Sequence, residues 1–119
     1  MPMYFFSKLI PPRPSFAFDM NDSERALMEQ HAKYWSRVAA DGNAVVFGPV
    51  ADLNGPFGLL VLEVEREEDA QKLIANDPVN QSGLGFKFET YPMLSAVTRK
   101  QVLERPLANQ DDRKNDQAF

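Results

Sequence analysis

The chain has 119 residues and a formal net charge of −4, and 44% of its residues are apolar and 25% charged. These values are typical of one globular domain, and the acidic balance argues against a nucleic-acid surface, which is normally basic. The absence of cysteine excludes disulfides and a thiolate nucleophile. No apolar run reaches the ~18 residues that span a bilayer, and the first residues lack the basic start of a signal peptide. We therefore expect a cytoplasmic protein with no membrane contact.

Residues 3–10, "MYFFSKLI", are rich in aromatic and branched side chains and end at two prolines, which predicts a strand with an abrupt stop. A proline-rich connection follows, and long connections in small domains often carry function. We then expect a helix with Asn21 as its N-cap, Glu24 in the matching capping-box position and Gly42 after its end.

The apolar residues of this helix recur at the helical period and form one stripe. They are Leu27, Met28, Tyr34, Trp35 and Val38. His31 lies at the centre of the stripe, one turn from both Leu27 and Trp35.

The second half of the chain predicts a hairpin, a helix and a final strand. Residues 43–52 and 57–65 are two apolar runs on either side of an Asn-Gly turn, which is a strong hairpin signal. A helix follows over roughly residues 67–76, and residues 85–93 alternate as a strand. The order β-α-β-β-α-β predicts an α+β, ferredoxin-like fold, in which two helices cover one face of a four-stranded antiparallel sheet.

Several strands are apolar on both faces, with Tyr4 and either Phe5 or Phe6 on the uncovered face, depending on register. A bare apolar face of that size is a liability in a monomer, so we expect a homodimer. The folded domain is expected over residues 1–100, and the polar residues 101–119 are expected to form a disordered or loosely docked tail.

His31 is the only histidine of the chain, and Asp77 precedes Pro78 at the end of the second predicted helix. Each has a structural interpretation: His31 as a hydrogen-bonded core residue, and Asp77 as a helix terminator, because a residue before proline disfavours the helical conformation. Each also has a functional one. Histidine suits general acid/base catalysis. The two helices of this fold run antiparallel, so Asp77 could approach His31 and hold its ring.

Four further residues are candidates for contacts with a small-molecule substrate. Arg13, in the proline-rich connection, could clamp an anion or be a structural arginine. Gly48 and Pro49, at a strand end, could form a bulge or let a ligand approach the backbone closely. Ser82 follows the Asp-Pro turn and could donate a hydrogen bond to a ligand or only stabilise the turn.

Other chemistries have little support in the sequence. One histidine and no cysteine leave no obvious metal site, and the chain has no phosphate-binding glycine loop. RNA-recognition domains share the predicted element order, but their third strand is basic and aromatic. Here the third strand, "FGLLVLEVE", has one aromatic residue and two acids. We therefore expect no metal and no nucleic-acid partner.

Four segments, "MEQHAKYW", "GNAVVFGPVADLNGPFGLLVLEV", "ANDPV" and "GLGFKFETYPM", resemble YciI-like (YCII-related) domain proteins in their order and spacing. The resemblance covers roughly residues 3–100. It implies a place in the dimeric α/β-barrel superfamily, in which two ferredoxin-like sheets pack face to face. It also implies a His and Asp pair in a pocket, at positions that match His31 and Asp77. Shorter members often carry an arginine one turn before the histidine, where this chain has Met28.

Some relatives are tied to lyase or isomerase chemistry on small ring-derived compounds. The first hypothesis is therefore a homodimeric enzyme, a lyase or isomerase without a cofactor. In it, His31, oriented by Asp77, moves a proton on a small anionic or phenolic substrate. The second is a non-catalytic ligand-binding or regulatory module that uses the same pocket, and the third is an interaction protein whose dimer is only a scaffold.

Overall fold

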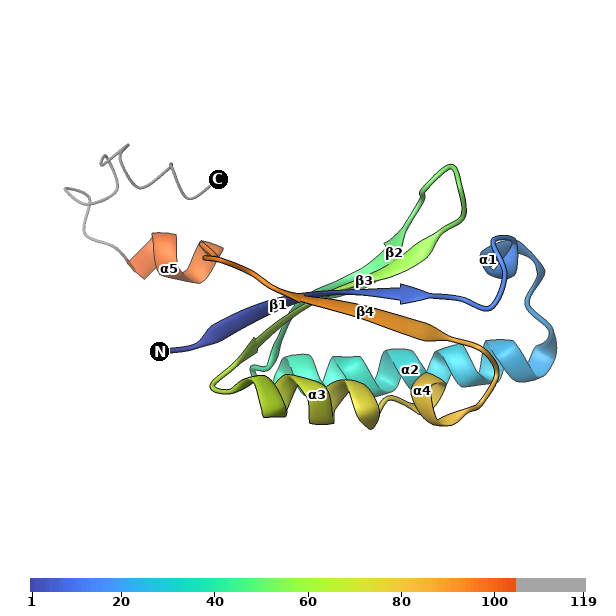
Figure 1. Ribbon diagram of the computed structural model, residues 1–119, viewed down its shortest axis with the longest axis horizontal. Coiled ribbons are helices and arrows are strands. Elements are labelled where there is room, and N and C mark those ends of the chain that lie inside the picture. Colours follow the sequence, from blue (N-terminus) through green and yellow to red (C-terminus); the bar gives the residue numbers. More distant parts are fainter. Residues whose placement is uncertain (105–119) are drawn as a thin grey trace.

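The computed structural model describes residues 1–104, whose strands form one antiparallel sheet with the longer helices on one side of it (Figure 1). In chain order the elements are β1 (Met3–Ile10), α1 (Phe16–Asp19), α2 (Asp22–Ala40), β2 (Ala44–Val50), β3 (Phe57–Val64), α3 (Glu67–Ala75), α4 (Pro78–Gln81), β4 (Lys87–Pro92) and α5 (Arg99–Glu104). The strands lie in the order β2-β3-β1-β4, and each neighbouring pair is antiparallel. This arrangement confirms the predicted ferredoxin-like α+β fold.

Three short helices, α1, α4 and α5, are absent from the sequence prediction. The first two have four residues each, which is too short for an apolar period to be visible. Helix α5 crosses the predicted domain boundary at residue 100, so residues 101–104 continue a helix. The remainder of the predicted tail, residues 105–119, lies outside the described residues. Among the described helices, none is long and apolar enough to cross a membrane.

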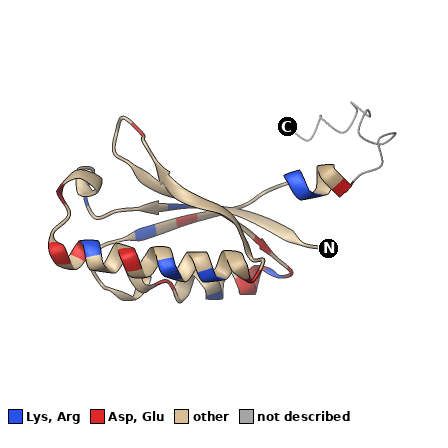
Figure 2. Cartoon of the chain, turned by 180° about the vertical axis from the view of Figure 1, so that it is seen from behind, with Lys and Arg blue, Asp and Glu red and all other residues tan. Residues whose placement is uncertain are grey.

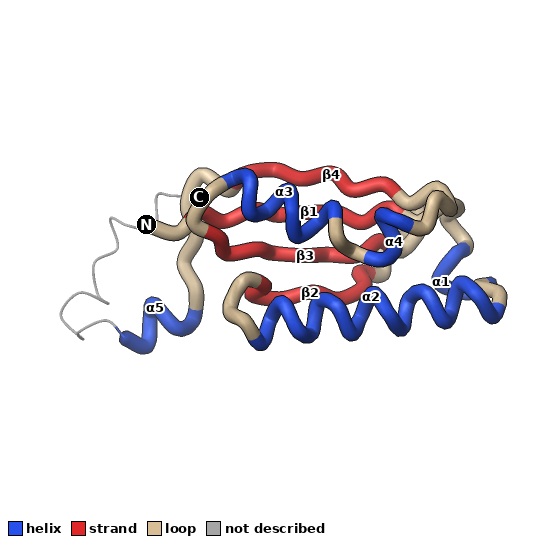
Figure 3. Tube along the Cα trace, turned by 90° about the horizontal axis from the view of Figure 1, so that it is seen from below, coloured by secondary structure: helices blue, strands red, loops and turns tan. Residues whose placement is uncertain are grey.

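The core lies between the sheet and the two longer helices. Helix α2 lies along the β2 side of the sheet, and α3 lies on the side of β1 and β4 (Figure 3). Ala44, Leu62 and Phe5 are adjacent across β2, β3 and β1, and all three belong to the buried cluster beneath the sheet. Trp35 and Val38 of α2 complete this part of the core.

The opposite face of the sheet carries an apolar row across all four strands. Val46 pairs with Val61, Val61 pairs with Phe6, and Phe6 pairs with Tyr91. Val46 and Tyr91 are 50% and 51% exposed, and the rings of Phe6 and Tyr91 stack with centroids 6.2 Å apart. This face is turned away from α2 and α3 (Figure 1). The register therefore places Phe6 on the open face and Phe5 in the core.

Arg13 ties the proline-rich connection to the start of α2. Its guanidinium donates to both carboxylate oxygens of Glu24, at 2.9 and 2.8 Å, and to Asp19 Oδ1 at 2.9 Å. Glu24 Oε1 also accepts the backbone N–H of Asn21 at 3.0 Å, and Asn21 Oδ1 accepts that of Glu24 at 2.8 Å, which completes the predicted capping box. The Arg13 guanidinium, followed by the Asn21 N–H, lowers the pKa of Glu24 to about 2.

Replacing Glu24 with glutamine should therefore make the protein less stable at neutral pH, and the deficit should shrink in acid. A carboxylate whose pKa is lowered in the folded state stabilises it fully above the unfolded-state pKa of about 4.5 and ceases to do so as pH falls towards 2. The melting temperatures of wild type and Glu24→Gln, measured from pH 7 to pH 2, should begin to converge below about pH 4.5 and become similar near pH 2. Glu29→Gln, an exposed change on the same helix, should have little effect at pH 7. A deficit for Glu24→Gln that stays constant down to pH 2 would contradict this role.

Candidate functional site

Asp77 ends one helix and begins another. Helix α3 stops at Ala75, and Asp77 has the extended backbone (φ −62°, ψ 132°) that the following Pro78 favours. Pro78 is the first residue of α4, where its missing N–H costs nothing. Oδ1 of Asp77 accepts the backbone N–H of Val79 at 2.9 Å, as an N-cap does. The turn that stops α3 therefore fixes the direction of the carboxylate.

The other carboxylate oxygen faces α2, against which α4 packs. Oδ2 of Asp77 accepts the indole N–H of Trp35 at 2.6 Å and lies 2.7 Å from Nδ1 of His31. The Asp77 side chain is fully buried (0% exposed). Three donors converge on it, and charge-assisted hydrogen bonds of this kind compensate a carboxylate for lost water. The antiparallel helices do bring Asp77 to His31.

The position of Asp77 assigns the tautomer of His31. A carboxylate only accepts hydrogen bonds, so the proton of the neutral imidazole lies on Nδ1, and Nε2 is an acceptor. Among residues 1–104, no group is hydrogen-bonded to Nε2, and the side chain is 16% exposed. The ring is thus held at one nitrogen and available at the other.

Tyr34, the residue before Trp35, also borders this pair. Burial, followed by the negative charge of Asp77, raises the pKa of Tyr34. Its hydroxyl therefore stays protonated, and it donates to the carbonyl of Leu73 at 2.5 Å. This hydrogen bond joins α2 to α3 just before the turn that carries Asp77.

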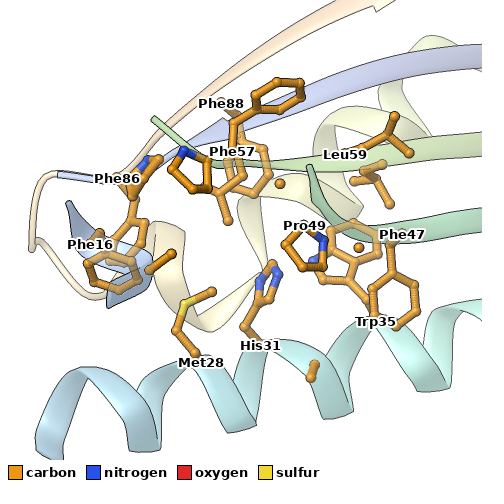
Figure 4. Close-up of a pocket in the computed structure, with 18 of the residues that line it drawn as sticks. Phe16, Met28, His31, Trp35, Phe47, Pro49, Phe57, Leu59, Phe86 and Phe88 are labelled. Carbon is orange, nitrogen blue, oxygen red and sulfur yellow. The ribbon is translucent and has the colours of Figure 1, made fainter. Parts of the chain in front are cut away.

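The available face of His31 borders a cavity of about 380 Å³ between α2, α1 and the β2–β3 side of the sheet (Figure 4). Five of the nine phenylalanines of the chain line it: Phe16, Phe47, Phe57, Phe86 and Phe88. Among the wall residues that belong to the described part of the chain, only His31 and Trp35 have side-chain nitrogen or oxygen atoms, and the Trp35 N–H is bonded to Asp77. The cavity is in the size range of ligand pockets in proteins.

The structure brings four of the six predicted site residues to one place. His31 lies in the wall with Asp77 behind it, and Gly48 and Pro49 form part of the opposite wall. A Cβ added to Gly48 would meet no described atom within 4 Å, so crowding does not require glycine there.

Arg13 and Ser82 do not line the cavity. The guanidinium of Arg13 is engaged by the acids described above, and the Ser82 hydroxyl donates to the carbonyl of Val79 at 2.7 Å. The structural interpretation of both residues therefore accounts for their contacts.

Sequence reasoning missed the second side chain that holds Asp77 and most of the cavity wall. The sequence places Trp35 in the apolar stripe of the helix. Trp35 follows His31 by four residues, so both side chains lie on one side of α2, and this spacing is the sequence signal that the two could share a partner. Phe16 comes from α1, which is too short to predict. It packs edge-on against Phe86, with ring centroids 5.2 Å apart, so the wall is closed by two residues 70 positions apart. Within residues 1–104, no three metal-ligating side chains gather.

The fold and the site define a small ferredoxin-like domain with a buried carboxylate behind a histidine that borders an apolar cavity. A family model for the YCII-related domain matches residues 4–94, and the chain belongs to that family. No curated protein matches the chain.

Several solved structures are similar to the chain in fold. The uncharacterized protein TM1266 from Thermotoga maritima shares 14% identity, with 78% of this chain and 99% of that chain covered and a TM-score of 0.46. Rv0793 from Mycobacterium tuberculosis shares 11% identity, with 82% and 100% covered and a TM-score of 0.49. The 5-chloro-2-hydroxyhydroquinone dehydrochlorinase TftG from Burkholderia phenoliruptrix AC1100 shares 16% identity, with 81% and 97% covered and a TM-score of 0.48.

A double-mutant cycle should detect coupling between His31 and Asp77. His31→Leu removes one donor and leaves the buried carboxylate with two, whereas Asp77→Asn removes the charge that His31 contacts. The two effects on the free energy of unfolding in denaturant should be non-additive by at least about 0.5 kcal/mol.

The matched control is the cycle of His31→Leu with Glu24→Gln, two turns away on the same helix and without a shared partner. Changes at such distant sites normally add within about 0.3–0.5 kcal/mol. Equal, near-zero coupling in both cycles would show that the His31–Asp77 contact is energetically unimportant.

Proposed function

We propose that the protein is a small-molecule lyase or isomerase in which His31, oriented by Asp77, acts as general acid and base. The observation that carries the proposal is the position of His31. Among the described residues, it is the one side chain of the apolar wall with a free nitrogen or oxygen atom, and a buried carboxylate holds its other nitrogen. An imidazole held in this way favours proton transfer at Nε2.

In the proposed reaction, Nε2 takes a proton from an acidic C–H of the bound substrate. The Asp77 carboxylate stabilises the resulting imidazolium. The electron pair left on carbon forms a new double bond. In an elimination the leaving group departs with its own bonding pair, and in an isomerisation the imidazolium returns the proton to another carbon. Neither route requires a redox cofactor, because no electrons are gained or lost overall.

A second candidate is a ligand-binding module without turnover. The composition of the cavity wall favours this second candidate in one respect: within residues 1–104, no second polar side chain is available in the wall to stabilise a departing group. The cavity beside His31 gives less support to a pure scaffold, because a scaffold would be expected to fill that space with side chains.

Proton exchange in D₂O tests the proposal without knowledge of the true substrate. Wild-type protein should accelerate deuterium incorporation into at least one member of a panel of small cyclic ketones, lactones and hydroxylated rings, followed by NMR. His31→Gln should reduce that rate by roughly 10²–10⁴-fold, because it removes the base. Lys33→Gln, an exposed change on α2, should retain the wild-type rate. Rates independent of His31 across the panel would overturn the proposal, and binding without exchange would favour the second candidate.

We also propose that the protein is a homodimer formed through the open face of the sheet. The apolar row of Val46, Val61, Phe6 and Tyr91 supports this, because a continuous exposed apolar surface usually marks an interface.

Placing a charge in that row should separate the dimer. Sedimentation at micromolar concentration should give a dimer for wild type and a folded monomer for Val46→Glu, because a buried, unpaired carboxylate opposes association. Gln71→Glu, the same charge change on the exposed side of α3, should remain a dimer. A wild-type protein that sediments as a compact monomer would exclude this interface.

A further inference from the structure

The charges around the cavity are placed so that none faces a ligand within it. Within residues 1–104, no Lys, Arg, Asp or Glu side chain lies in the wall, although charged residues make up 25% of the chain. Residues 44–62, which supply the β2–β3 part of the wall, contain one charged residue, Asp52, and it lies near the hairpin turn (Figure 2).

Two cations, Arg13 and Lys8, lie near the cavity but outside its wall. Arg13 packs over Phe16, a wall residue, with its guanidinium carbon 5.3 Å from the ring centroid, but its N–H groups are directed to Asp19 and Glu24. The Lys8 ammonium lies 4.5 Å from the ring centroid of Phe57, another wall residue, and Lys8 is the register partner of Glu89 across β1 and β4. Neither cation lines the cavity, so an anion bound there would have no counter-charge from the wall.

The wall also supplies few donors from its backbone. Three of its residues, Pro11, Pro49 and Pro56, have no backbone N–H. A carboxylate in this cavity would lose its water, and the neutral His31 ring would offer it no donor, because Nε2 is an acceptor. Burying a charge without compensating partners is unfavourable.

The polarity of His31 adds a second requirement. Because Asp77 holds the proton on Nδ1, the neutral ring presents an acceptor to the cavity. A ligand satisfies it best with a hydroxyl donor. The aromatic rings of the wall favour a flat apolar body, which can make offset or edge-on contacts with them. A cavity of about 150 Å³ lined by Leu, Ile and Phe holds benzene, so 380 Å³ accommodates a substituted ring.

We infer that the cavity binds a neutral, hydroxyl-bearing ring compound and rejects ring carboxylates, so that the substrate class is phenolic or enolic and uncharged. This inference rests on the proposed function for the role of the site, but it concerns binding and can be tested without turnover. It also separates the two substrate types that the sequence left open, since the anionic one has no partner in the wall.

Two probes of almost the same shape test the charge requirement. 4-Hydroxyacetophenone is neutral, and 4-hydroxybenzoate carries a carboxylate in place of the acetyl group. Titrated into wild-type protein and followed by the ring signals of the single histidine, the neutral probe should bind at least about tenfold more tightly. Acetophenone, which lacks the hydroxyl, should bind several-fold more weakly than 4-hydroxyacetophenone.

A change in the wall provides the matched control. Met28 lines the cavity one turn before His31, and Met28→Lys adds a cation with little change in length. This variant should bind 4-hydroxybenzoate at least about tenfold more tightly than wild type does, whereas Met28→Leu should keep the wild-type preference. If Met28→Lys does not fold, the comparison of the two probes in wild type and Met28→Leu still decides the question.

The outcomes separate this inference from the proposed function. Equal or tighter binding of 4-hydroxybenzoate by wild type would overturn the inference, as would binding of neither probe at millimolar concentration. Tight binding of the neutral probe together with deuterium exchange that does not depend on His31 would support the inference and overturn the proposed catalysis.

Discussion

Three hydrogen bonds converge on the Asp77 carboxylate, from the imidazole of His31, the indole of Trp35 and the backbone N–H of Val79. The carboxylate is fully buried, so these donors replace the water that it loses on folding. They also join three parts of the chain: the middle of α2, the turn after α3 and the start of α4. The same contacts that make the buried charge tolerable therefore fix the orientation of the histidine ring.

The apolar cavity changes what this pair can do. A hydrogen bond to a charged group is stronger where water is excluded, and the described part of the wall beside His31 offers no competing polar side chain. Charged side chains instead form ion pairs outside the wall. Arg13, for example, contacts Asp19 and Glu24, and these contacts fix the connection that carries Phe16. Ion pairs that lie outside the wall thus help to hold a mostly apolar cavity in place.

The order of elements and the approach of Asp77 to His31 could be predicted because both follow from local signals. The helix stripe fixed which side of α2 carries His31, and the Asp-Pro pair fixed where the second long helix stops. In the ferredoxin-like fold the two long helices run antiparallel, which brings the end of the second helix, and with it Asp77, beside His31 on the first. The contacts of Arg13 could not be predicted, since nothing in a solvated or structural arginine's sequence context identifies which acids lie near it in space.

The composition of the cavity wall also could not be predicted from the sequence. Phe86 comes from the loop before β4, and its contact with Phe16 joins segments 70 residues apart that only the tertiary structure brings together. Trp35 was placed correctly in the stripe, but its indole N–H has a partner only because α4 begins at Pro78. Long-range contacts of this kind leave no periodic signal along the chain.

The tautomer of His31 in the free wild-type protein is the most direct measure of whether Asp77 orients the ring. Long-range ¹H–¹⁵N NMR distinguishes a protonated from an unprotonated ring nitrogen, and the chain has only one histidine to assign. At a pH at which the ring is neutral, the account predicts that the proton lies on Nδ1 and that Nε2 is unprotonated. A ring that carries its proton on Nε2 would contradict the account, because Nδ1 would then have no proton to donate to Asp77 and the cavity would face a donor instead of a base.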